Sequence, residues 1–127
     1  MRLNIAGTSP YEPVIGFSRA VRVGQSVYVS GTGPVGADLA DAATQTRHIL
    51  EIIRESLKKA GARLEDVVRT RIYLTSAEVW EEVGKAHGEF LRAIRPAATM
   101  VVVAALLQPT WHVEIEAEAV VNSAPQP

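Results

Sequence analysis

The chain contains no cysteine and almost no net charge, and each shortage excludes a class of function. Without cysteine there can be no disulfide framework, no thiolate nucleophile and no cysteine-based zinc site. The net charge of −1 creates no field that would attract nucleic acid or an anionic membrane. No apolar run is long enough to span a bilayer, and Met1–Pro10 lacks the apolar core of a secretory signal. We therefore expect a cytoplasmic protein that binds neither nucleic acid nor membrane.

Apolar residues, by contrast, make up 47% of the 127 positions, which suits a single domain with a substantial core. We expect that domain to cover residues 1–121. The tail 122–127 is rich in proline and small polar residues, and we expect it to be disordered.

Hydrophobic periodicity predicts the element order ββαβαββ. Two valine-rich strands, 17–23 and 26–30, flank the turn Gly24-Gln25 and indicate a hairpin. A helix over about 41–60 presents one apolar stripe, a third strand covers 67–74, and a second helix runs over about 75–91. The helix stripe consists of Thr46, Ile49, Leu50, Ile53, Leu57 and Ala60, and one face of the third strand carries Val68, Thr70, Ile72 and Leu74.

The C-terminal segment 95–120 indicates two further strands, the second with a carboxylate at every other position. Alternation places Glu114, Glu116 and Glu118 on one face of that strand and an apolar series on the other. Two helices are too few to cover both faces of the sheet, so we expect them to share one face. The bare face would carry these glutamates with Arg69 and Arg71, either solvated or buried in a symmetric oligomer, which we favour.

Three short motifs give no support to familiar chemistries. Gly31–Gly36 matches G-x-G-x-x-G, but Pro34 interrupts it and the next helix begins too late for a dinucleotide site. Ser18 opens a strand, whereas the serine of a nucleophile elbow lies between a strand and a helix. The three histidines lack metal-ligand spacing, and we predict no metal.

Glu114 differs from the other acidic residues of its strand because it lies next to the loop 108–112. A carboxylate at a strand end, in a partly dry cleft, can act as a general base on water. Glu114 is therefore the candidate catalytic residue.

Several segments together resemble the Rid family, also called YjgF/YER/UK-type proteins. The resemblance covers about residues 14–121 and rests on their order and spacing. The matching segments are SRAVRVGQSVYVSG, Gln45-Thr46-Arg47, LEDVVRTRIYL, the positions Pro96, Thr99 and Val101, and the closing Val113-Glu114-Ile115-Glu116-Ala117.

The resemblance implies a chorismate-mutase-like α/β fold with one mixed sheet, assembled as a homotrimer around a central barrel, with a ligand cleft between each pair of subunits. It also implies hydrolysis of reactive enamines or imines without a cofactor, with Glu114 at the position of the glutamate that orients or activates water. The family's arginine, which binds the substrate carboxylate through two hydrogen bonds, stands two residues after the proline that corresponds to Pro96.

At that arginine position this chain has Ala98, at the position of an aromatic hydroxyl it has Phe17, and at that of an asparagine it has Gly84. Losing the arginine removes a charge-assisted pair worth about 1.5–3 kcal/mol. The further expected contacts with substrate are Arg19, Ser30, Gly31, Thr99 and Met100. Arg19 or Arg71 would have to supply a relocated anion clamp.

Two functions follow with equal weight. The chain is either a hydrolase or deaminase for an enamine or imine outside the standard amino-acid-derived set, or a non-catalytic trimer that binds a metabolite or stabilises a partner. An endoribonuclease ranks last, because the sheet face is acidic and the chain lacks a histidine pair.

Overall fold

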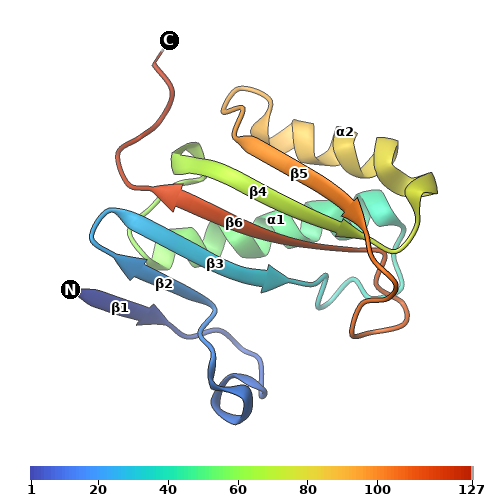
Figure 1. The fold of residues 1–127 in the computed structure, drawn as a ribbon, viewed down its shortest axis with the longest axis horizontal. Coiled ribbons are helices and arrows are strands. Elements are labelled where there is room, and N and C mark those ends of the chain that lie inside the picture. Colours follow the sequence, from blue (N-terminus) through green and yellow to red (C-terminus); the bar gives the residue numbers. More distant parts are fainter. Residues whose placement is uncertain (127) are drawn as a thin grey trace.

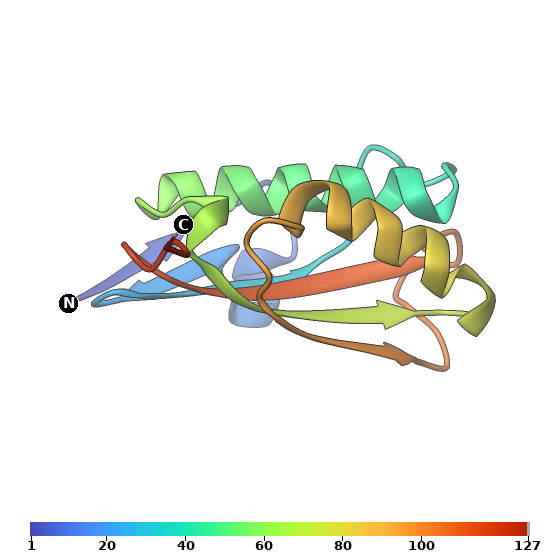
Figure 2. The same cartoon turned by 90° about the horizontal axis from the view of Figure 1, so that it is seen from above.

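A computed structural model describes residues 1–126 and shows one six-stranded sheet with both helices packed on the same face (Figures 1 and 2). Regular elements follow one another along the chain as β1 (Arg2–Ile5), β2 (Ala20–Val23), β3 (Ser26–Thr32), α1 (Ala42–Lys59), β4 (Val67–Leu74), α2 (Trp80–Leu91), β5 (Ala97–Val102) and β6 (Val113–Val120). Single helical turns occur at η1 (Glu12–Gly16), η2 (Leu64–Asp66) and η3 (Ala77–Val79). The predicted α/β fold is confirmed, with β1 as an additional strand.

The sheet has the strand order β1-β2-β3-β6-β4-β5, so the last strand of the chain lies in its interior. Neighbouring strands are antiparallel except β4 and β5, which are parallel and are connected through α2. A parallel pair needs such a crossover, because a tight turn cannot return the chain to the same end of the sheet. The sheet is therefore mixed, as expected.

Helix α1 begins and ends where the sequence predicts. Asp41 caps its first turn by accepting a hydrogen bond of 2.7 Å from the backbone N–H of Thr44, and this bond lowers the pKa of the Asp41 carboxyl. Gly61 follows the helix with a φ of +80°, a conformation that favours glycine. The predicted stripe is buried against the sheet at every one of its six positions, so this prediction is confirmed.

Two local predictions were wrong. The first strand begins at Ala20 and not at Phe17, because η1 runs to Gly16 and Phe17 ends that helical turn. In β4 the register with β6 shifts between Val67 and Arg69, which is a β-bulge. The bulge inverts the face at this point, so Val67 is buried and Val68, expected on the buried face, is 40% exposed.

The face of the sheet opposite the helices carries the expected charges. Arg71 forms ion pairs with Glu116 and Glu118, at 3.4 and 3.1 Å, and the hydroxyl of Tyr73 donates to Glu116. This bond to a carboxylate raises the pKa of the Tyr73 phenol. Arg69 instead donates to the hydroxyl of Thr99 at 2.9 Å. Glu114 belongs to none of these pairs, which separates it from the structural charges of the face.

Ser123 anchors the start of the C-terminal tail, since its backbone N–H donates to a carboxylate oxygen of Asp66 at 3.2 Å. Disorder of the tail stays a prediction, and Pro127 lies outside the described residues. Between residues 1 and 126, no helix is both long and apolar enough to cross a membrane.

Candidate active site

Glu114 lies at the start of β6, on the face opposite the helices, with its carboxylate against the backbone of Gly31. A Cβ added at Gly31 would collide with Oε2 of Glu114 and lie 3.4 Å from its Cδ. Burial raises the pKa of the Glu114 carboxyl, and the positive charge of Arg19 partly opposes that rise. A carboxylate that loses water without gaining an ion pair is a stronger base than an exposed one.

The loop before Glu114 is held by a fully buried side chain from α1. The amide nitrogen of Gln45 donates to the carbonyl oxygens of Asp38 and Thr110, at 3.2 and 3.0 Å. Its amide oxygen accepts from the backbone N–H of His112 at 2.8 Å. Gln45 thus fixes Thr110 and His112 in the loop before β6 and, through them, the position of Glu114.

Trp111 lies on the other side of this loop and covers Gly33. The indole N–H of Trp111 donates to Asp38 at 2.6 Å, and a Cβ at Gly33 would overlap the indole ring. The glycines of the motif Gly31–Gly36 therefore permit close packing, with Gly31 against Glu114 and Gly33 against Trp111. Helix α1 begins only at Ala42, so no helix N-terminus lies within the motif, as a dinucleotide site would need.

Arg19 lies behind Gly31 and binds the backbone there. Its Nη2 donates to the carbonyl oxygens of Ser30 and Gly31, at 2.6 and 2.8 Å, while its Nε is buried without a partner among the described residues. Burial lowers the pKa of the guanidinium, and Glu12 and Glu114 oppose this effect from a distance. Ser30, Gly31, Arg19 and Glu114 thus form one group within a single chain, and Phe17 lies two residues before Arg19.

The remaining predicted residues lie elsewhere. Ala98 pairs in register with Thr70, whose side chain is buried beneath α2, so Ala98 faces the helix side of the sheet, opposite to Glu114. Met100 shares that side and lines a cavity of about 260 Å³ with Trp80. Gly84 lies on α2, in a hollow of about 490 Å³. Thr99 faces the same side as Glu114, but on the outermost strand β5.

The residues predicted to contact a ligand therefore lie in two separate groups, one around Glu114 and one around Ala98, which are called the two half-sites below. Arg71, considered as a clamp, already has two carboxylate partners. In residues 1–126 no group of three or more His, Asp or Glu side chains could hold a metal ion. A desolvated carboxylate against a glycine backbone can take a proton from water, and that is the chemistry this arrangement offers.

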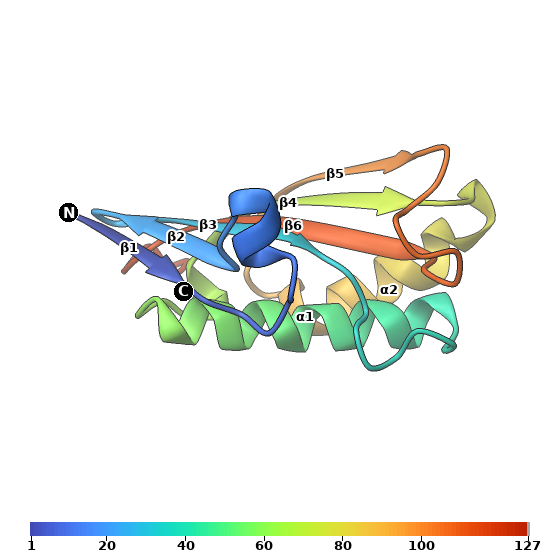
Figure 3. The ribbon, with the colours of Figure 1, turned by 90° about the horizontal axis from the view of Figure 1, so that it is seen from below.

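No sequence pattern singles out Glu12, which lies near the same group of residues. Its two carboxylate oxygens accept from the backbone N–H of Gly7, at 3.0 and 3.1 Å. This fold-back holds the segment between β1 and η1 beside Arg19. Gly7 lies against both Glu12 and Arg19, although the three residues are apart in the sequence. Figure 3 shows the path of the chain between β1 and β2 that makes this contact possible.

Comparisons with known proteins agree on what such a chain is. The family described as Endoribonuclease L-PSP matches residues 7–121. The solved structure of Rv2704 from Mycobacterium tuberculosis, a member of the YjgF/YER057c/UK114 family, has a TM-score of 0.90 at 47% identity, over 95% of this chain and 100% of that one. The 3-aminoacrylate deaminase RutC from Acinetobacter baylyi is 34% identical over 89% of this chain and 91% of its own length. TdcF from E. coli, solved with bound serine, has a TM-score of 0.78 at 26% identity, over 92% of each chain.

The chain has a mixed six-stranded sheet with two helices on one face, and Glu114 lies near the start of its interior last strand. These features define a class of small α/β proteins. The matches in sequence and structure identify that class. The chain belongs to the Rid family, which is the YjgF/YER057c/UK114 family, and a 3-aminoacrylate deaminase is among its relatives.

Proposed function

We propose that this protein hydrolyses a reactive enamine or imine, with Glu114 as the base that activates water. The supporting observation is the Glu114 carboxylate itself, which is partly buried, has a raised pKa and forms no ion pair within residues 1–126. The similarity to a 3-aminoacrylate deaminase supports the reaction class, because 3-aminoacrylate is an enamine.

In this reaction an enamine first gains a proton on carbon and loses one from nitrogen, which gives the imine. Glu114 removes a proton from water as the hydroxyl oxygen adds to the imine carbon, and the imine nitrogen gains a proton. In the resulting carbinolamine the hydroxyl proton passes to nitrogen as the C–N bond breaks, which releases an amine or ammonia and leaves a carbonyl compound. Backbone groups at Gly31 stabilise the charge that develops next to Glu114.

The substrate class follows from the second half-site. Ala98 offers no charge to a substrate carboxylate, and Met100 and Trp80 line an apolar cavity nearby. A substrate without a carboxylate next to the imine therefore fits better than an imine derived from a standard amino acid.

A complete cleft needs another copy of the chain, and we propose the homotrimer. The half-site around Ala98 lies on the opposite side of the sheet from Glu114, so one chain cannot present both to one small molecule. The edge strand β5 also leaves apolar side chains uncovered, with Val101 and Val102 exposed by 42% and 53%. Apolar edge strands of this kind invite pairing with another chain.

The test compares the wild-type protein with Glu114→Gln on imines generated in place from amino acids and from uncharged amines. We expect the wild type to hydrolyse imines of uncharged amines faster, and the variant to lose at least about 100-fold in kcat/KM. Because the base must be ionised, the wild-type rate should rise with pH through a pKa above the ordinary glutamate range. Undiminished turnover in Glu114→Gln would exclude Glu114 from the mechanism.

The second candidate is a non-catalytic trimer that binds a metabolite or stabilises a partner. Ala98 and Gly84 favour it, because a cleft without its polar anchors can still hold an apolar ligand. In that case no imine would be hydrolysed, while ligand binding at the cleft would persist in Glu114→Gln. The third candidate, cleavage of RNA, is tested by adding RNA to the same assay.

A further inference from the structure

Two cavities lie on the helix side of the sheet, away from Glu114, between α1 and the segment that links β1 to η1. Figure 3 shows this segment descending to α1 before the chain enters η1. The first cavity has a volume of about 350 Å³ and the second about 240 Å³, and they share Thr8, Arg19, Val35 and Ile52. Because they share these residues, the two cavities adjoin, and together they are called the recess below.

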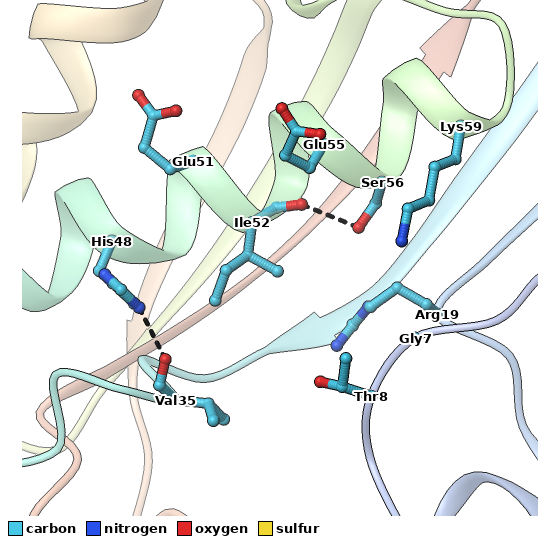
Figure 4. A pocket seen from close by; sticks show the side chains of 10 residues that line it. All are labelled: Gly7, Thr8, Arg19, Val35, His48, Glu51, Ile52, Glu55, Ser56 and Lys59. Atoms are coloured by element: carbon cyan, nitrogen blue, oxygen red, sulfur yellow. Dashed lines mark hydrogen bonds between the residues drawn. The ribbon is translucent and has the colours of Figure 1, made fainter.

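Two cations face the first cavity, and they come from different elements. Figure 4 shows the guanidinium of Arg19 and the ammonium of Lys59, at the last turn of α1, pointing into the same space beside Thr8. Within residues 1–126, neither cation forms an ion pair. An anion placed between these two cations would be attracted by both of them.

The acidic residues nearby do not fill this role. Glu51 and Glu55 extend away from Arg19 in Figure 4, and Glu51 is paired with Arg54 at 2.6 Å. Glu12, in the second cavity, has both oxygens engaged by the N–H of Gly7. The charge of Glu12 partly balances that of Arg19. Lys59, the other cation of the recess, forms no ion pair within residues 1–126.

The far end of the recess is apolar and partly aromatic. Val35 and Ile52 form the wall common to both cavities, and the second cavity adds Pro10, Tyr11 and Trp111. A cationic end joined to an apolar end matches a ligand with one carboxylate and one flat apolar body.

We propose that this recess is a second binding site, distinct from the Glu114 cleft, for a small aryl or branched-chain carboxylate. The carboxylate lies between Arg19 and Lys59, and the apolar body extends over Val35 and Ile52 toward Trp111. The site is independent of the proposed hydrolysis, because none of its walls belongs to the Glu114 half-site except Arg19.

Arg19 connects the two sites physically. Its Nη2 holds the carbonyl oxygens of Ser30 and Gly31, and the Glu114 carboxylate packs against Gly31. A ligand that draws the guanidinium toward Lys59 must act on these two hydrogen bonds. The recess therefore offers a route by which a carboxylate can adjust the peptide beside Glu114.

The experiment titrates benzoate into the ¹⁵N-labelled full-length protein at constant ionic strength, followed by NMR. We expect saturable shifts at the amides of Gly7, Thr8 and Gly31 and at the indole N–H of Trp111. Lys59→Gln should weaken benzoate binding about tenfold, because one charge-assisted contact is lost. Benzyl alcohol, which has the same ring and no charge, should not bind at this site.

Lys58→Gln is the matched control, because Lys58 is the neighbouring residue of α1 and lines a different cavity. It should bind benzoate as the wild type does, and Glu114→Gln should differ from the wild type by less than about threefold. The proposal is overturned by an unchanged affinity in Lys59→Gln, by equal binding of benzyl alcohol, by shifts confined to Glu114 and Phe17, or by the absence of saturable shifts. None of these outcomes depends on whether the protein hydrolyses imines.

Discussion

The Glu114 carboxylate can occupy its position only because Gly31 has no side chain. No other side chain leaves room, because even a methyl group would overlap Oε2 of Glu114. The backbone of Gly31 is held from the other side by Arg19. In the site, Gly31 therefore lies between the Glu114 carboxylate and the Arg19 guanidinium, which form no ion pair with each other.

Gly31→Ala should displace Glu114 and lower kcat/KM at least about tenfold, while destabilising the fold by about 1–3 kcal/mol. Gly88→Ala is the control, because a Cβ at Gly88 would meet nothing within 4 Å and its helical φ needs no glycine. That variant should be more stable by about 0.5–1 kcal/mol, with activity unchanged. Denaturant unfolding and imine hydrolysis measure both, and full activity in Gly31→Ala would contradict the proposed placement of Glu114.

At this scale the sequence could single out Glu114 but not its surroundings. Glu114 is distinguished by its position beside a loop, which alternation along β6 reveals. The contact between Gly31 and Glu114 depends on a register shift between Val29 and Thr32, and no periodicity encodes it. The roles of Glu12 and Lys59 depend on the path of the segment before η1, so they could not be predicted from the sequence either.

At the scale of elements, α1 holds the loops of the site through one buried polar residue, Gln45. Gln45 is a polar residue at a fully buried position. Its side chain binds Asp38, in the loop after Gly33, and the two residues that flank Trp111. A buried amide is tolerated because both its oxygen and its nitrogen have partners.

Gln45→Leu keeps the volume of the side chain and removes its hydrogen bonds, leaving buried backbone groups without partners. We expect a loss of about 2–4 kcal/mol in the free energy of unfolding, measured in urea. Thr46→Val is the matched control, since it removes only a 2.8 Å bond to Ala42 within the same helix, and should cost about 1 kcal/mol. Equal losses in the two variants would show that Gln45 does not hold the loops.

Helices α1 and α2 could be predicted from sequence because their apolar residues recur at helical spacing over several turns. Strand β1 could not, since only Ile5 of its four residues is buried and no alternation develops. The bulge at Val68 escaped for a related reason. A periodic pattern assigns every residue to one face of the strand. It does not indicate where a β-bulge shifts the register and so reverses the faces.

On the scale of the whole molecule, the edge strand β5 and the separation of the half-sites are the two features that support the proposed trimer. We expect the wild-type protein to have three times the mass of one chain by light scattering. Val101→Asp places a charge on the exposed apolar edge and should shift the protein toward the monomer. Leu39→Asp, at a loop residue that is 90% exposed, should leave the trimer intact.

A wild-type monomer, or dissociation by both variants alike, would refute the proposed assembly. The fold, the shared face of the helices and the family were predictable from the chain alone. The trimer was implied by family resemblance and by the bare face, but its geometry depends on surfaces that only another copy can complete.

The interior position of β6 also determines when this protein can fold during its synthesis. The strands β1 to β3 and the pair β4 and β5 have no contact in the sheet except through β6, which bridges β3 and β4. A ribosome must therefore deliver Val113–Val120 before the two parts can join. Until then the nascent chain exposes two unfinished edges, and its protection from aggregation depends on the last strand to emerge.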